Sequence, residues 1–132
     1  MPLELDHLIL RVKDADESVA FYTEVLGLRY EGRREPFAVL RVTPRLTLQL
    51  AAWGTKGGEH LAFAMEPAEF DAAFERIRKA GIPYGDSFQS VGNMKGPGEE
   101  PGARGNGRAL YLFDPSRHLI EIRSYQPPRS AS

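Results

Sequence analysis

The sequence contains no cysteine and has almost no excess charge of either sign. Its 132 residues include 17 Lys and Arg against 18 Asp and Glu, for a formal net charge of -1. Without cysteine there are no disulfides, thiolate nucleophiles or thiolate metal ligands, so a metal site would need nitrogen and oxygen donors. Because near-neutral charge provides no basic surface for nucleic acid and no charged tail for an anionic membrane, we expect neither as a partner.

Long apolar runs are also missing. The uninterrupted apolar stretches are only a few residues long, so no transmembrane helix is predicted. The segment Met1–Glu4 lacks the charged and apolar regions of a signal peptide, so we expect a cytoplasmic protein. A chain of this length can bury roughly two-thirds of its unfolded surface, and we expect one domain over residues 1–132.

The sequence does contain an internal repeat. Asp6–Leu10 and Glu59–Phe63 each place an acid and a histidine before an apolar run that is typical of a buried strand. A helical pattern follows each run, with apolar residues at intervals of three or four, and it ends at Gly27 in the first copy and at Gly81 in the second. The two copies therefore have the same arrangement.

After each glycine the pattern becomes that of strands, so each copy reads as a strand, a helix and three more strands. This order predicts an α+β fold of two tandem βαβββ modules, at about residues 5–54 and 58–125. The eight strands are expected to form a curved, incompletely closed, barrel-like sheet around a cavity. Two segments do not repeat: a glycine-rich loop at about residues 90–107, either a lid or a surface excursion, and a frayed tail at 126–132.

Four polar residues occupy equivalent places in the two copies. His7 and His60 each begin the first strand of a copy, and Gln49 and Glu121 each lie between two aliphatic residues in the last strand. Because side chains alternate along a strand, Gln49 and Glu121 should face away from the layer that buries their neighbours. If that layer packs on the helices, these side chains point into the cavity.

Two histidines and one carboxylate that converge in a cavity form a facial triad with open positions for water or substrate. Such a set suits a divalent ion of iron, manganese, nickel, zinc or cobalt, and Gln49 could supply a fourth, neutral oxygen. The predicted ligands are therefore His7, His60, Glu121 and Gln49. His118 has an odd strand offset from Glu121, so we expect it in a turn or a supporting role.

Residues that could hold a substrate are harder to select. Trp53 and Tyr125 follow Gln49 and Glu121, where they could line the pocket or end the strands in the core. Four basic side chains could bind an anionic substrate, although each would more often be a solvated charge on the surface. They are Arg41, Lys95, Arg104 and Arg108.

Together these motifs resemble the vicinal oxygen chelate superfamily, which includes glyoxalase I, methylmalonyl-CoA epimerase, fosfomycin-resistance proteins, extradiol dioxygenases and bleomycin-binding proteins. The resemblance extends from Asp6 to Tyr125. Its most specific segments are Asp6–Leu8, Phe21–Leu28, Glu59–Phe63 and Tyr111–Glu121.

The resemblance implies a divalent-metal-dependent enzyme. In metal-dependent branches the ligand positions match His7, His60 and Glu121, and Gln49 matches the fourth position of glyoxalase and epimerase members. It favours a glyoxalase I-like lyase or isomerase, acting on a small substrate that chelates the metal through vicinal oxygens. By the same resemblance Glu121 would be the catalytic base, whereas the amide of Gln49 cannot serve as a second base. A homodimer is expected on this ground alone.

Two other functions stay open. An extradiol dioxygenase would use the same triad with iron but needs a further pocket histidine, and the only spare is His118. A binding protein could sequester a small molecule or an antibiotic without turnover. Fosfomycin ring opening is disfavoured, because Ile9 stands where the glutathione-dependent resistance proteins carry a threonine.

Overall fold

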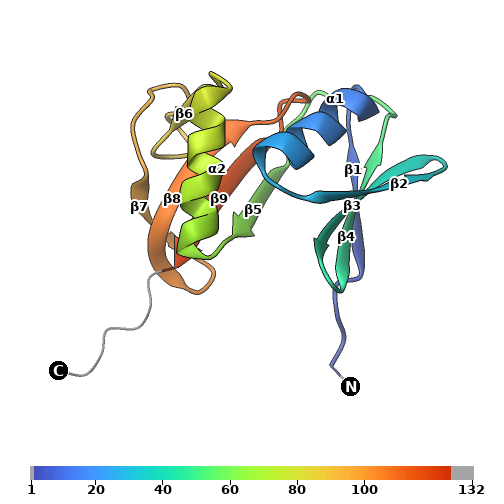
Figure 1. Ribbon diagram of the computed structural model, residues 1–132, viewed down its shortest axis with the longest axis horizontal. Helices are drawn as coiled ribbons and strands as arrows, with labels where there is room; N and C mark the ends of the chain where they lie inside the picture. Colours follow the sequence, from blue (N-terminus) through green and yellow to red (C-terminus); the bar gives the residue numbers. More distant parts are fainter. Residues whose placement is uncertain (1, 126–132) are drawn as a thin grey trace. The chain divides into compact units, whose positions relative to one another are not determined.

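The computed structural model describes residues 2–125, which divide into two compact units. Of the described residues, one unit contains residues 2–57 together with Asp114–Arg117, and the other contains Gly58–Phe113 and residues 118–125. Across these described residues there are nine strands, two α-helices and one short π-helix (Figure 1). The predicted α+β class is confirmed, and the predicted tail, 126–132, lies outside the described residues.

The first unit is a four-stranded sheet with one helical segment. Its elements are β1 (His7–Arg11), α1 (Ala15–Ala20), the π-helix η1 (Phe21–Val25), β2 (Arg29–Arg34), β3 (Phe37–Thr43) and β4 (Leu46–Ala51). The strand order is β1-β4-β3-β2, with β1 parallel to β4 and the other pairs antiparallel. The Asp14 carboxylate caps α1 by accepting the Glu17 N–H at 2.8 Å, and Gly27, at φ 86°, follows the helical segment.

The second unit repeats this plan. Its elements are β5 (His60–Ala64), α2 (Pro67–Lys79), β6 (Tyr84–Gly85), β7 (Gly98–Gly102), β8 (Gly105–Phe113) and β9 (Leu119–Tyr125). The order β5-β9-β8-β6, with β5 parallel to β9, matches the first sheet, and β7 also pairs with β8. Helix α2 lies along this sheet and buries Phe70, Ala73 and Ile77 (Figure 1).

The glycine-rich segment is not a continuous loop. Residues 98–102 form β7 and residues 105–107 begin β8, so the expected loop over 90–107 is wrong for these positions. A high glycine content usually indicates turns, but here the missing side chains of two glycines allow neighbouring residues to pack closely against the backbone. A Cβ at Gly98 would clash with the Asp86 backbone, and a Cβ at Gly102 would clash with the Arg123 guanidinium.

A buried turn belongs to the first unit although it lies between β8 and β9 in the sequence. The Tyr22 hydroxyl of η1 donates to Asp114 Oδ2 at 2.6 Å, and both residues are buried. Asp114 Oδ1 accepts the Ser116 N–H, and Ser116 Oγ accepts the Lys13 N–H. These polar contacts attach the turn to the first helical segment.

Candidate functional site

Two predicted ligands, His60 and Glu121, lie side by side in the second unit. The parallel register pairs His60 with Leu119 and Ala62 with Glu121, which places the histidine and the carboxylate on one face of the sheet. His60 Nε2 lies 3.0 Å from Glu121 Oε1. The His60 side chain is 48% exposed and that of Glu121 only 7%, so a ligand can approach the pair from the imidazole side.

The first unit has an equivalent pair of positions. Ile9 pairs with Gln49 and His7 with Thr47, so His7 and Gln49 share one face of β1 and β4. The neighbours of Gln49, Leu48 and Leu50, are almost fully buried on the opposite face. His7 Nδ1 lies 2.8 Å from Asp6 Oδ2, and when Nδ1 donates to this carboxylate, Nε2 is the unprotonated nitrogen.

Arg123 is a neighbour of Glu121 that the sequence reasoning missed. Its Nη1 donates to Glu121 Oε2 at 2.6 Å, and its side chain is only 3% exposed. Nη2 donates to the Glu100 carbonyl at 2.8 Å, while Nε is buried without a hydrogen-bond partner. The alternation that placed Glu121 on this face also applies to Arg123, two residues later, and could have identified it.

Tyr111 of β8 lies opposite Glu121 in the strand register. Burial raises the pKa of Tyr111 to about 12, and the negative charge of Glu121 adds to this shift. The phenol therefore keeps its proton at neutral pH. It is a potential proton donor on the face that holds His60 and Glu121.

A pocket of about 420 Å³ lies over this face of the second unit. Strands β5 and β9 and the β7–β8 hairpin all contribute to its lining. The small side chains of Ala62 and Ala64 leave room next to His60. The other lining residues are Pro101–Arg104, Glu121, Arg123 and Tyr125.

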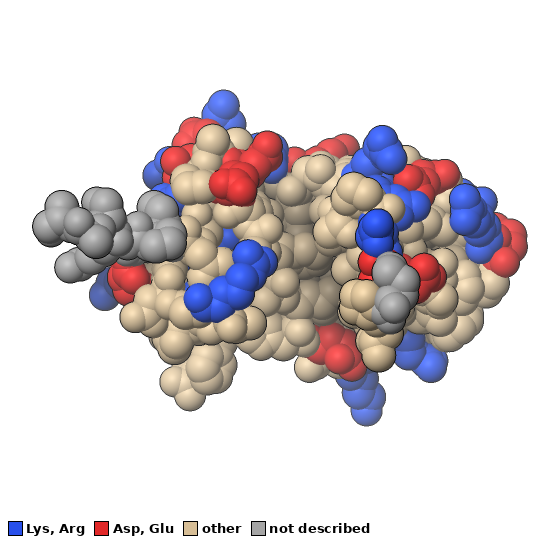
Figure 2. Space-filling model, turned by 90° about the horizontal axis from the view of Figure 1, so that it is seen from below, with Lys and Arg blue, Asp and Glu red and all other residues tan. Residues whose placement is uncertain are grey.

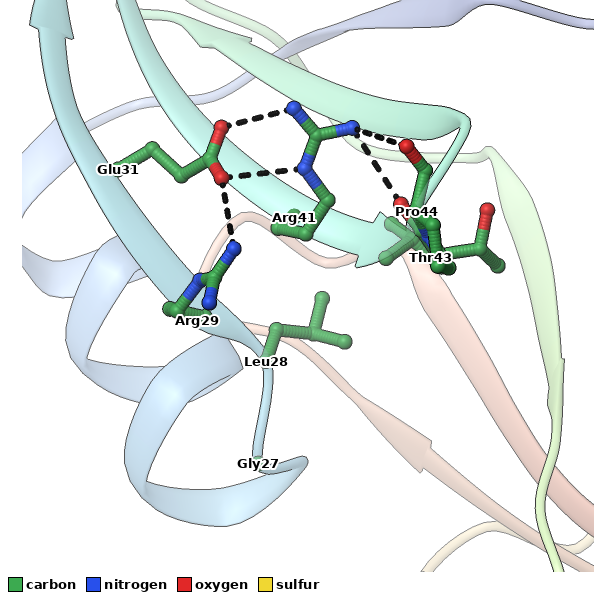
Figure 3. Close-up of a pocket in the computed structure, with 8 residues that line it drawn as sticks. Gly27, Leu28, Arg29, Glu31, Arg41, Thr43 and Pro44 are labelled. Atoms are coloured by element: carbon green, nitrogen blue, oxygen red, sulfur yellow. Dashed lines mark hydrogen bonds and ion pairs between the residues drawn. The ribbon is translucent and has the colours of Figure 1, made fainter.

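The first unit has a pocket of about 590 Å³ beside an ion cluster of Arg29, Glu31 and Arg41 (Figure 3). Arg41 donates to both Glu31 oxygens, at 3.0 and 3.1 Å, and Arg29 adds a bond of 3.2 Å. The hydrogen bond from Arg41 lowers the pKa of Glu31. Arg41 also donates to the carbonyls of Thr43 and Pro44, so its guanidinium is already engaged.

Other residues singled out from the sequence lie in structural positions. His118 is buried, and its Nδ1 accepts the Glu59 N–H at 3.1 Å. Arg108 pairs with Asp71 at 2.9 Å. Trp53 is 51% exposed and packs against Phe37, so it is not a core residue.

Charge on the surface is mixed. On the face shown in Figure 2, acidic and basic side chains form small neighbouring groups rather than a large patch of one sign. No helix within residues 2–125 is long and apolar enough to cross a membrane. In the same part of the chain, no group of three or more His, Asp or Glu side chains is arranged to hold a metal ion.

The family model for the Glyoxalase/Bleomycin resistance protein/Dioxygenase superfamily matches residues 4–122, which extend over most of both units and include both polar pairs. The chain belongs to this superfamily. The resemblance inferred from the repeat and its histidines is therefore confirmed. The fold agrees as well, since a solved structure of the oxidase ChaP-H2 superposes with a TM-score of 0.79 at 26% identity, covering 97% of this chain and 98% of that one.

Two proteins of known name are similar in sequence to most of this chain. Virulence protein STM3117 of Salmonella typhimurium is 30% identical over 132 residues, covering 92% of this chain and 83% of the relative. Fosfomycin resistance protein FosX of Mesorhizobium japonicum is 28% identical over 113 residues, covering 86% and 70%. The superfamily around this chain thus includes an oxidase and resistance proteins, and none of these three names describes a glyoxalase I reaction.

Proposed function

We propose that the protein is a divalent-metal-dependent enzyme that acts on a small substrate with two neighbouring oxygens. The proposed ligands are His7, His60 and Glu121, with Gln49 as a fourth. The observation that carries the proposal is the 3.0 Å approach of His60 Nε2 to Glu121 Oε1 on an open face of β5 and β9. His7 and Gln49 have the equivalent sheet positions in the first unit.

The donor chemistry fits such an ion. Imidazole nitrogens and carboxylate or amide oxygens are ligands for iron, manganese, nickel, zinc and cobalt. The carboxylate of Asp6 at His7 Nδ1 is the supporting contact that often orients a metal-binding histidine. A bound divalent ion would polarise the substrate oxygens and stabilise negative charge that develops on them.

A glyoxalase I-like isomerisation also needs a base for a carbon-bound proton. Arg123 occupies Oε2 of Glu121, so Oε1 is the oxygen that would serve alternately as metal ligand and as base. The amide of Gln49 cannot take this role, so we propose a mechanism with one base.

Two relatives favour other substrates of the same site. FosX is named for fosfomycin resistance, which adds epoxides to the substrates worth testing despite Ile9. The oxidase ChaP-H2 is named for redox chemistry, which keeps the dioxygenase alternative and its catechol substrates in the test. Sequestration without turnover is the non-enzymatic alternative. Because one fold supports several reactions, the substrate must be found by experiment.

The test is a metal-by-substrate screen on protein purified without a tag or chelator. Hemithioacetals, catechols, CoA thioesters and epoxides would be offered with manganese, iron, nickel, zinc and cobalt. We expect metal binding by the wild type, its loss in H60A and E121A, and its retention in E66Q, which removes an exposed carboxylate outside the site. Retention of the metal in both site variants would show that the ligand set is wrong. Metal binding without turnover of any substrate would favour the binding protein.

We also propose that the chain forms a homodimer. β1 lies at one edge of its sheet, and Leu8 and Ile9 on it are 43% and 47% exposed. Exposed apolar side chains on an edge strand favour association with another chain. Light scattering after gel filtration should give twice the mass of one chain, and L8K should weaken the dimer. A monomeric wild type at micromolar concentration would contradict the proposal.

A further inference from the structure

The pocket next to His60 and Glu121 has an unbalanced charge. Two of its charges cancel, because Arg123 and Glu121 form a buried ion pair of 2.6 Å. Arg104 also lines the pocket, and no carboxylate among residues 2–125 lies within ion-pair distance of its guanidinium. Arg104 is therefore the positive charge in the lining that lacks a countercharge.

The side chain of Arg104 is held at this position by Tyr125. The guanidinium carbon lies 4.8 Å from the centre of the Tyr125 ring, and the Arg104 backbone N–H donates to the Tyr125 hydroxyl at 3.2 Å. A guanidinium that stacks on an aromatic ring keeps the N–H donors at its edge available. Those donors match the two oxygens of a carboxylate or a phosphonate.

Ion pairs distinguish Arg104 from two of the other cations selected from the sequence, and the lining of the pocket excludes the third, Lys95. Arg41 is engaged by Glu31, and Arg108 is paired with Asp71. Glu100 shares the sheet face with the pocket through its register with Gly107, but it does not line the pocket. Among these cations, Arg104 alone lines the pocket that contains His60 and Glu121.

We propose that Arg104 is a specificity-determining residue that binds an oxyanionic group of the substrate, a carboxylate or a phosphonate. The neighbouring oxygens of the same molecule would meet His60 and Glu121, a part of the proposal that rests on the proposed function. Ala62 and Ala64 leave room between these two ends, and a volume of about 420 Å³ suits a small molecule. The substrate class is then a small anionic compound with vicinal oxygens.

The test compares three catechol probes of similar size by isothermal titration calorimetry. They are protocatechuate, its phosphonate analogue and the neutral 4-methylcatechol. Each is titrated into metal-free and Mn²⁺-supplemented protein. We expect the wild type to bind at least one anionic probe about tenfold more tightly than the neutral one, the gain typical of a charged hydrogen-bonded pair. The tighter of the two anionic probes identifies the group.

The matched variants are R104Q and R78Q. Arg78 is also a guanidinium over an aromatic ring, 4.4 Å from Phe74, but it lies on α2 and does not line the pocket. R104Q should remove most of the preference for anions, and R78Q, with the same change in net charge, should retain it. Equal preference in R104Q and the wild type, or equal loss in both variants, would overturn the role of Arg104. A wild type without any preference would overturn it as well.

Mn²⁺ binding is measured separately on the same proteins. R104Q should bind Mn²⁺ as the wild type does, because Arg104 is not among the proposed ligands. A wild type that fails to bind any of the metals tested rejects the proposed function, while the preference in the metal-free protein still decides the role of Arg104. The two proposals can therefore fail independently.

Discussion

At the scale of single residues, the two oxygens of Glu121 have different partners. Oε1 faces the half-exposed imidazole of His60, and Oε2 is held by the buried guanidinium of Arg123. The arginine fixes the orientation of the carboxylate. Glu121 can therefore offer one oxygen to a ligand while its other oxygen maintains the position of the side chain.

Replacing Arg123 should destabilise the fold. In R123M the buried Glu121 carboxylate loses its partner, and breaking a buried ion pair from one side costs about 3 kcal/mol. Urea unfolding should show this loss, and the double variant R123M/E121L should recover much of it because it leaves no buried charge. R78M, at an exposed ion pair, should change the free energy of unfolding by less than about 0.5 kcal/mol. An R123M protein as stable as R78M would contradict this account.

Tyr22 should make stability depend on alkaline pH. Burial, and then the negative charge of Asp114, raise the pKa of Tyr22 well above its ordinary value of 10. Above pH 10 the unfolded chain releases this proton while the folded protein retains it, so stability falls as the pH rises, by up to about 1.4 kcal/mol per pH unit. Y22F lacks this contribution. It should therefore lose less stability than the wild type between pH 10 and 12 in urea titrations, although it starts from a lower value. An equal loss of unfolding free energy with pH in Y22F and the wild type would contradict the raised pKa of Tyr22.

At the scale of elements, helix α1 has only six residues and depends on its cap. D14A removes the acceptor of the Glu17 N–H and should lower the free energy of unfolding by about 1 kcal/mol. D14N retains an acceptor and should stay within a few tenths of the wild type. D16A removes a neighbouring charge but no cap, so it should unfold at a higher temperature than D14A. Equal melting temperatures for D14A and D16A would show that the cap does not stabilise this segment.

The repeat made most elements predictable, and the failures have physical causes. The first strands, both helices and the orientation of Gln49 and Glu121 follow from local periodicity and alternation, which the sequence displays directly. Strand β7 does not, because Gly98 and Gly102 give no apolar signal and are explained by close contacts with Asp86 and Arg123. The charge balance around Arg104 likewise depends on which side chains meet across strands, and local sequence does not contain that information.

At the scale of the whole molecule, each compact unit holds half of the proposed ligands. His60 and Glu121 belong to the second unit, and His7 and Gln49 occupy the equivalent positions in the first. Two arrangements of the metal site differ in the number of ions bound per chain. If each half bound an ion alone, two ions would bind per chain, but two protein donors are too few for a tightly held divalent ion. The proposed ligand set therefore predicts one ion per chain.

The variants of His7 decide between these arrangements. If one ion is shared, H7A in the first unit should abolish binding as fully as H60A in the second, and the two losses should not add in the double variant. At a free Mn²⁺ concentration one hundred times Kd, the ion should raise the free energy of unfolding of the wild type by about 2.7 kcal/mol and that of H7A by almost nothing. Thermal shift measures the stabilisation by the ion, and elemental analysis measures the metal that stays bound. An H7A protein that still binds one ion with wild-type affinity would place the metal in the second unit alone, with His7 as a surface histidine hydrogen-bonded to Asp6.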